Sequence, residues 1–364
     1  MSYTKEETTL IWLDSFSGLE YKHKREIYAA LQTEKDVIAA VNACRGYITE
    51  NAGERVFETL INSFNRTYTD YILSGLSRKG VRAITRVSDG YPERLNVVPS
   101  PPFVLYVKGD ETLLGEKTIG MVGSRKSLPV SVNIAKEFSE TFAKAGFTPV
   151  TGIAEGVDSA VIRGALDGGG KVISVIAGGF DHVYPAANAS LIDKVTEKGL
   201  AVAEYPPYVK PDRFMFPVRN RIIAGLSDGV LVVSGAKKSG TLYTAEYAEE
   251  FGRDLFAVPY GVGIESGEGC NDLIKRGAML CDTSDDILNF YGVEKKKTKI
   301  PLSAEETNVI NVLRDGAKHI DEISRALGRE SYEILTTLPV LEIKGVVAKN
   351  GVNVYGLIRN LTEV

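Results

Sequence analysis

Glycine-rich and cationic segments follow several apolar runs in the middle of the chain. Gly123-Ser124-Arg125 comes directly after one such run, and Lys238-Ser239-Gly240-Thr241 follows another. Glycine lets the backbone approach a ligand closely, and the N–H groups at a helix start attract anions together with Arg or Lys. These residue types indicate a phosphate site. A tight turn with a solvated arginine explains the first segment equally well when it is taken alone.

Two further segments carry the same chemistry. Gly152 opens another glycine-rich stretch, and Phe216 precedes two arginines that flank an amide, Arg219, Asn220 and Arg221. Guanidinium groups suit bidentate contacts to phosphate oxygens. An ordinary turn is a fair explanation for any one of these segments, but their recurrence favours one shared anion site.

Signatures of catalysis are weak by comparison. The sequence has no HExxH or GxxxxGK[ST] pattern, which are typical of zinc proteases and P-loop nucleotide hydrolases. No histidine lies near the serine-rich loops, so a Ser-His triad is not expected. Asp158 is expected to bond backbone N–H groups at a helix start, and Glu204 to be solvated or to cap a helix rather than act as a base. Cys44, Cys270 and Cys281 form no CxxC pair and the three histidines are widely spaced, so we expect no disulfide framework and no metal site.

The composition is that of a globular protein without cationic character as a whole. The 364 residues include 43 Lys and Arg against 47 Asp and Glu, a net charge of −4, and 44% are hydrophobic. Contacts with nucleic acid would therefore need a local basic patch. Residues 1–9 are polar, unlike a signal peptide, and no apolar run is long enough to span a membrane. We expect a cytoplasmic protein of two or three domains that does not bind membranes.

The middle of the chain alternates apolar runs with amphipathic segments. Strands are predicted at 103–107, 118–122, 148–151, 172–176, 201–203, 230–233 and 255–258, and helices at 130–144, 157–166, 187–198 and 241–251. Apolar strands separated by helices predict a parallel sheet that is covered on both faces. We therefore expect a doubly wound α/β domain over 86–293. Ligands bind beyond the carboxyl ends of such strands, where the glycine-rich segments lie.

Helical segments flank this domain. Residues 1–85 are expected to be helical, and Phe16 to Leu19 could form a helix-hairpin-helix turn over a phosphate, although a plain helix–loop–helix is favoured. The charged stretch 294–299 is a predicted linker. Residues 300–364 predict three helices and a hairpin that turns at Asn350-Gly351, which is the winged-helix pattern. A small docking module could share that pattern.

The ordered set of segments resembles the DNA-processing protein A (DprA, also Smf) family of bacteria. The run from Arg219 to Ser227, Arg-Asn-Arg-Ile-Ile-Ala-Gly-Leu-Ser, is highly specific. The other matching segments are Pro101-Pro102-Phe103-Val104-Leu105-Tyr106, Gly123-Ser124-Arg125, Thr151-Gly152-Ile153-Ala154, Tyr184-Pro185, Glu204-Tyr205-Pro206 and Lys238-Ser239-Gly240. The resemblance covers most of the chain, from Tyr91 through the winged-helix segment.

The resemblance implies a non-catalytic binder of single-stranded DNA without a cofactor. Such proteins protect incoming strands during natural transformation, help load the RecA recombinase, and work as homodimers on an extended Rossmann-like domain. Carried over residue by residue, the DNA site comprises Gly123, Ser124, Arg125, Arg219, Asn220, Arg221, Lys238 and Ser239. The reading from residue chemistry adds Gly152, Gly240 and Thr241, with Phe216 as a surface on which bases stack.

The chain departs from the family pattern at a few positions. Glu155 stands where Lys or Arg is usual, and a carboxylate beside a phosphate is repulsive by roughly 1 kcal/mol at the effective dielectric of a protein surface. Ile162 stands where His is usual, Ser234 where Glu is usual, and Tyr260 where Gly is common. Weaker DNA binding or a different register of the strand would follow from the first change.

Two other function classes stay open at this stage. One is an enzyme that cleaves nucleoside monophosphates at the glycosidic bond, of the Lonely-guy type, because Ser239-Gly240-Thr241 with Glu246 loosely resembles its phosphate loop. The other is a protein-interaction adaptor that acts through the winged helix and has no DNA affinity in 86–293.

Overall fold

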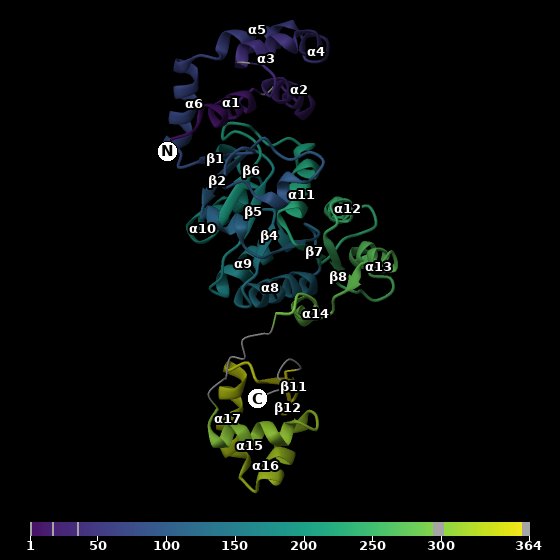
Figure 1. Cartoon of the computed structure of the whole chain (residues 1–364). Coiled ribbons are helices and arrows are strands. Elements are labelled where there is room, and N and C mark those ends of the chain that lie inside the picture. Colours follow the sequence, from purple (N-terminus) through teal and green to yellow (C-terminus); the bar gives the residue numbers. More distant parts are fainter. Residues whose placement is uncertain (1, 17, 35, 294–301, 359–364) are drawn as a thin grey trace. The chain divides into compact units, whose positions relative to one another are not determined.

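The protein is described by a computed structural model that covers residues 2–16, 18–34, 36–293 and 302–358. The chain divides into two compact units, residues 1–295 and residues 296–364 (Figure 1). We call them unit 1 and unit 2 and describe each by itself. The predicted linker at 294–299 lies outside the described residues, as does Ser17 of the predicted hairpin turn.

A nine-stranded sheet forms the centre of unit 1, in the order β1-β2-β6-β5-β4-β3-β7-β8-β9. The strands are β1 Arg82–Thr85, β2 Val104–Gly109, β3 Thr118–Val122, β4 Thr148–Thr151, β5 Ile173–Ile176, β6 Leu200–Ala203, β7 Gly229–Val232, β8 Asp254–Ala257 and β9 Met279–Leu280. All neighbours are parallel except β1 with β2 and β2 with β6. The predicted α/β class with a wound parallel sheet is confirmed, with an antiparallel edge added.

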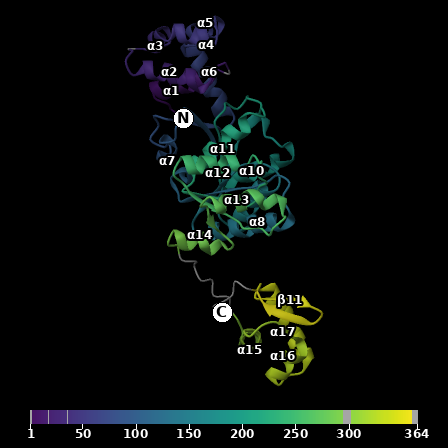
Figure 2. The same ribbon diagram turned by 90° about the vertical axis from the view of Figure 1, so that its right-hand side faces the viewer.

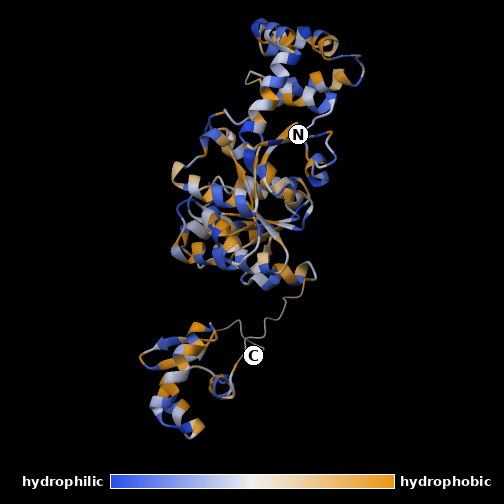
Figure 3. Ribbon diagram, turned by 90° about the vertical axis from the view of Figure 1, so that its left-hand side faces the viewer, coloured by the Kyte–Doolittle hydropathy of each residue, from blue (hydrophilic) through white to orange (hydrophobic). Residues whose placement is uncertain are grey.

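Helices cover both faces of this sheet. They are α7 Glu93–Asn96, α8 Pro129–Lys144, α9 Val157–Asp167, α10 Ala189–Lys198, α11 Met215–Leu226, α12 Leu242–Glu250, α13 Glu268–Lys275 and α14 Ser284–Phe290, with 3-10 turns at Glu111–Gly115, Phe180–His182, Ala186–Asn188 and Glu265–Gly267. Leu231 packs with α8, α9 and α14, whereas the next residue, Val232, packs with α11, α12 and α13. Side chains alternate along a strand, so both faces are buried and the strands are almost wholly apolar (Figure 3).

The strand order creates a switch point between β3 and β7. From β3 the chain adds β4, β5 and β6 on one side, and α11 then returns it to β7 on the other side of β3. The connections that follow β3 and β7 therefore leave in opposite directions at the carboxyl edge. Open α/β sheets bind their ligands in the crevice that results.

Six helices precede the sheet within unit 1. They are α1 Lys5–Asp14, α2 Tyr21–Leu31, α3 Val37–Ala43, α4 Arg45–Asn51, α5 Glu54–Ser63 and α6 Arg66–Arg78. Their apolar side chains gather around Trp12, which is buried. The Asp14 carboxylate ties this group to the sheet, because it accepts hydrogen bonds from Lys24 Nζ at 2.7 Å and from the Tyr106 hydroxyl of β2 at 2.9 Å.

The described residues of unit 2 form three helices and a small sheet (Figure 2). Its elements are α15 Ala304–Leu313, β10 Lys318–His319, α16 Ile320–Leu327, α17 Ser331–Ile343, β11 Val347–Gly351 and β12 Val354–Leu357, and the sheet order is β10-β12-β11. Ile323, Leu338 and Leu341 lie in its core. The predicted set of three helices and a hairpin is therefore present.

The hairpin turn lies two residues beyond its predicted position. Gly351 pairs with Val354, so the turn consists of Val352 and Asn353, and the prediction of a turn at Asn350-Gly351 was wrong. The register shifts directly before Gly351, and Asn353 adopts a φ of 56°. Asparagine tolerates this left-handed conformation better than most residues, which allows the turn to form there.

Two features are absent from the described ranges. No helix among these residues is long and apolar enough to cross a bilayer. Within the same ranges, no group of three or more His, Cys, Asp or Glu side chains is placed to hold a metal ion.

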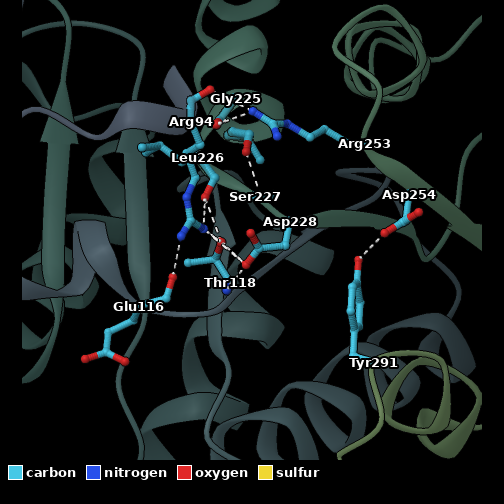
Figure 4. A network of polar contacts seen from close by, with 11 residues as sticks. Arg94, Glu116, Thr118, Gly225, Leu226, Ser227, Asp228, Arg253, Asp254 and Tyr291 are labelled. Atoms are coloured by element: carbon cyan, nitrogen blue, oxygen red, sulfur yellow. Dashed lines mark hydrogen bonds and ion pairs between the residues drawn. The ribbon is translucent and has the colours of Figure 1, made fainter. Parts of the chain in front are cut away.

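A polar network joins the amino ends of β3 and β7 (Figure 4). Arg94 donates hydrogen bonds to Thr118 Oγ1 at 2.6 Å, to Asp228 Oδ2 at 3.1 Å and to the Glu116 carbonyl at 2.9 Å. Asp228 Oδ2 also accepts the backbone N–H of Thr118 at 2.8 Å, and Arg253 donates to the Arg94 carbonyl at 2.7 Å. This network lies at the opposite end of the strands from the crevice, so it fixes the sheet without entering the crevice.

We expect Arg94→Ala to lower the free energy of unfolding by about 1–3 kcal/mol, because Asp228 and several backbone carbonyls lose their donor. Denaturant melts followed by circular dichroism measure this change. Arg66→Ala is the matched control, since that side chain is 95% exposed on α6, and should shift stability by less than about 0.5 kcal/mol. Equal effects of the two variants would show that the network does not hold the sheet.

Candidate functional site

An open pocket of about 790 Å³ lies at the carboxyl edge of the sheet, in the crevice between β3 and β7. The loop after β3, the start of α11 and the segment that leads into α12 form its walls. Nine of the twelve residues predicted for the site line this pocket: Gly123, Ser124, Arg125, Phe216, Arg219, Asn220, Ser239, Gly240 and Thr241. Segments that are far apart in the sequence therefore meet at one place.

The other three predicted residues, Gly152, Arg221 and Lys238, do not line the pocket. Arg221 is two positions from Arg219 on α11, and about 100° of rotation per residue turns it to the other side of the helix. There it forms a buried ion pair with Glu204. Lys238 is exposed outside the lining, and Gly152 lies buried beneath it.

Arg219 and Asp158 are almost wholly buried at the floor of the pocket, on either side of Gly152. A Cβ atom on Gly152 would lie 2.3 Å from Asp158 Oδ2 and 2.6 Å from Arg219 Nη1, so only glycine fits there. Arg219 donates to the carbonyl of Val175 at the end of β5, and Asp158 Oδ2 accepts the N–H of Ala154 at 3.1 Å. Burial raises the pKa of Asp158 and lowers the pKa of Arg219, and the nearby opposite charge counteracts both shifts.

The loop after β3 is packed tightly against the start of α9. A Cβ atom on Gly123 would come within 2.4 Å of the Val157 side chain. Gly156 adopts a φ of +78°, and a Cβ atom there would lie 2.6 Å from the carbonyl oxygen of Ser124. The backbone N–H of Ser124 donates to Ser234 Oγ at 3.1 Å, from the loop after β7. These contacts fix the backbone that carries Arg125.

Aromatic rings form one wall of the pocket. The Arg125 guanidinium lies 5.0 Å from the centre of the Phe216 ring, a cation–π distance. The Tyr184 ring meets Phe216 edge to face, with centres 5.8 Å apart. The pocket therefore combines a cation with π faces, which is the chemistry that binds phosphates and unpaired bases together.

Polar groups surround the start of α12 on the opposite wall. Asn220 Nδ2 of α11 donates to the Gly240 carbonyl at 3.3 Å, and Ser239 Oγ accepts the N–H of Thr241 at 3.3 Å. Thr244 also lines the pocket, and its buried Oγ1 has no hydrogen-bond partner within the described part of the chain. Hydroxyls and backbone N–H groups at a helix start can donate to an anion in this position.

The pocket is cationic although the protein as a whole is acidic. Its lining includes four cationic side chains, Arg125, Lys126, Arg213 and Arg219, and one carboxylate, that of Asp158. The whole chain has a net charge of −4. The local basic patch that nucleic-acid binding requires is therefore present at this edge of the sheet.

Among the lining residues that sequence reasoning did not assign to the site, three carry an aromatic ring or a positive charge: Tyr184, Lys126 and Arg213. Tyr184 belongs to a matching segment of the resemblance, and that was its only signal. Lys126 directly follows the predicted loop, and charge next to a candidate anion site could have indicated it. Arg213 precedes α11 in a segment without periodicity, so only the fold places it.

The structure also places three of the positions where the chain departs from the family pattern. Glu155 is exposed and lines a small adjoining pocket of about 90 Å³ together with Arg125 and Phe216. Ile162 is buried in an apolar core, and Ser234 is buried beneath the loop after β3. Of the three, only Glu155 brings a charge to the pocket edge.

Comparisons with known proteins identify relatives of both units. Residues 82–292 match the family model of DNA recombination-mediator protein A, and residues 293–350 match the DprA winged helix domain. DNA processing protein DprA of Bacillus subtilis is 38% identical over 217 residues, 59% of this chain and 73% of that protein.

Two solved structures also resemble the chain. DNA processing protein A from Streptococcus pneumoniae matches 79% of this chain and 98% of that one, with a TM-score of 0.67 and 30% identity. DNA processing protein A from Helicobacter pylori, described for its single-stranded DNA binding mode, matches 59% of this chain and 97% of that one, with a TM-score of 0.54 and 27% identity.

We expect Gly152→Ala to destabilise the protein by about 1–3 kcal/mol, because the added methyl group would overlap Asp158 and Arg219. The matched control is Gly240→Ala at the pocket wall, where an added Cβ atom meets nothing within 4 Å. The control should leave the melting temperature nearly unchanged. If Gly152→Ala melted like the unmodified protein, the close packing below the pocket would be disproved.

Proposed function

This chain belongs to the DNA-processing protein A (DprA/Smf) family, and we propose that it is a recombination mediator that binds single-stranded DNA in the pocket at the carboxyl edge of the sheet. One observation carries the proposal. Arg125, Arg219 and Phe216 come together with the start of α12 in a single pocket. The single-stranded DNA binding described for the Helicobacter pylori relative supports the same ligand.

The geometry suits a strand whose bases are unpaired. Phosphates would lie against Arg125, the loop after β3 and the start of α12, while a base would stack on Phe216 or Tyr184. Stacking and phosphate contacts accept every base, so little sequence preference is expected. In a duplex the bases are stacked inside, so no base face is free to stack on the Phe216 ring.

The cellular role follows from the family. We propose that the protein protects incoming single strands during natural transformation and helps load the RecA recombinase onto them as a homodimer in the cytoplasm. It would act by binding, without a cofactor and without a catalytic step. We also propose the domain division expected from the sequence, namely a helical domain at 1–85, a Rossmann-like DNA-binding domain at 86–293, a linker at 294–299 and a winged-helix domain at 300–364.

An enzyme that cleaves nucleoside monophosphates is the less favoured alternative. The resemblance of this chain to the phosphate loop of such enzymes depends on Glu246. This residue is exposed on α12 and is not among the residues that line the pocket. Incubation with AMP followed by an assay for free adenine separates the two functions. Adenine release above a no-protein blank would overturn the binding-only proposal.

We expect Arg125→Ala to weaken binding to labelled oligo-dT and to make it less sensitive to salt. Each neutralised phosphate contributes about −0.7 to the slope of log affinity against log salt, so loss of one contact should reduce the slope by about that amount. Fluorescence anisotropy over a range of salt concentrations measures the slope. Arg55→Ala, an exposed arginine on α5, is the control, and unchanged binding of the Arg125 variant would remove this residue from the site.

A separate substitution tests base stacking. Phe216→Ala should cost about 1–3 kcal/mol of binding free energy, the range for one stacked base, while leaving the salt slope nearly unchanged. Phe216→Tyr keeps the ring and should retain most of the affinity in the same assay. If Phe216→Ala lowered the slope as much as Arg125→Ala does, the ring would act only by positioning the guanidinium.

A further inference from the structure

The outer face of α17 in unit 2 carries apolar side chains. Four large ones are exposed on it, with exposed fractions of 67% for Tyr332, 48% for Leu335, 42% for Val340 and 87% for Ile343. The inner face packs Ile334, Leu338 and Leu341 into the core of unit 2. A helix with apolar side chains on two opposite faces normally buries both, but the described residues of unit 2 cover only one face of α17.

The exposed apolar residues form one stripe. A rotation of 100° per residue places Tyr332, Leu335, Val340 and Ile343 within about 140° of the helix surface, and the stripe runs for about 16 Å along the axis. The same rotation places Glu333 on one flank of the stripe and Glu342 on the other. No Lys or Arg lies within Ser331–Ile343. An apolar stripe of this length between two acidic flanks is a surface suited to protein contacts.

The charge of this surface is unsuited to DNA. In helix-turn-helix proteins a recognition helix enters the DNA groove, and Lys and Arg side chains neutralise the nearby phosphates. As the last helix before the wing, α17 occupies the corresponding position. The only charged side chains within Ser331–Ile343 are the carboxylates of Glu333 and Glu342. Phosphates would be repelled at this face.

We propose that the outer face of α17 docks an amphipathic helix of another protein, whose apolar stripe is flanked by Lys or Arg. Two helices that pair along apolar stripes choose their partners through the charges beside the stripe. The flanks Glu333 and Glu342 select a basic partner. A second copy of this chain would bring acid against acid along the same stripe, which is repulsive. The proposal does not depend on the single-stranded DNA pocket, which lies in unit 1.

The test uses the full chain and two fluorescein-labelled synthetic peptides of 18 residues. Both carry leucine at helical spacing; lysines flank the stripe in one peptide, and glutamates replace these lysines in the other. We expect fluorescence anisotropy to show that the lysine peptide binds at least tenfold more tightly than the glutamate peptide. The double variant Glu333→Lys/Glu342→Lys should reverse this preference.

Surface variants locate the binding face. Leu335→Ser/Ile343→Ser should weaken binding of the lysine peptide at least tenfold, while the melting temperature and the affinity for oligo-dT stay unchanged, because both side chains are exposed. Val352→Ser is the control, since this valine is equally exposed (85%) but lies in the hairpin turn. It should bind the peptide like the unmodified chain.

Four results would overturn the proposal. The lysine peptide could fail to bind, or it could bind the Leu335→Ser/Ile343→Ser variant as well as the unmodified chain. Alternatively, sedimentation could show that this double variant abolishes a dimer of the full chain, which would make the stripe a contact between copies. A loss of duplex DNA binding in the same variant would assign the face to nucleic acid instead.

Discussion

The candidate site depends on two opposite charges that are buried side by side below the pocket. Asp158 and Arg219 come from different helices, α9 and α11, and only the missing side chain of Gly152 leaves room for both. A buried charge without its partner is costly, so the two helix starts are held at fixed positions relative to the end of β4. The walls of the pocket are built on those helix starts. The place of Phe216 and Asn220 therefore follows from the two buried charges beneath them.

The two ends of the sheet have different tasks. At the amino ends, Arg94 and Asp228 tie strands, helix and loops together with well-formed hydrogen bonds. At the carboxyl ends, the same strands give way to glycines and exposed cations. The hydrogen bonds that stabilise the sheet thus lie at the amino ends of the strands, where no ligand is expected. The carboxyl ends can therefore carry positive charges close together. Arg125 and Arg219, both in the pocket lining, repel each other, and an arriving phosphate would relieve that repulsion.

Most of the sheet was predictable from the sequence, because strands buried on both faces are nearly continuous apolar runs. The predicted strands at 118–122 and 148–151 coincide with β3 and β4, and the other five differ by one or two residues at one or both ends. The resemblance to the DprA/Smf family was also confirmed. The convergence of the glycine-rich loops followed from a general rule, since the carboxyl ends of parallel strands share one edge.

The wrong or missing predictions concern residues whose positions depend on the rotation of a helix about its axis or on contacts with residues far away in the sequence. No helix was predicted over 215–226, so nothing distinguished Arg219 from Arg221, and both were placed in the site. On α11 the two arginines point to different sides of the helix, and Arg221 forms an ion pair with Glu204. Tyr184 reaches the pocket from a segment between β5 and β6, and its meeting with Phe216 is purely tertiary. The hairpin turn lies at Val352 and Asn353 instead of at Asn350-Gly351, because Asn353 also adopts the left-handed conformation that a tight turn needs.

The size of the pocket, about 790 Å³, limits how much polymer a single molecule can hold there. The space is enough for only a few nucleotides, so each copy would occupy only a brief stretch of a long chain. Coverage would then depend on how many copies are present per nucleotide. Gaps between neighbouring copies would stay open, and a filament-forming protein could start its own growth in them.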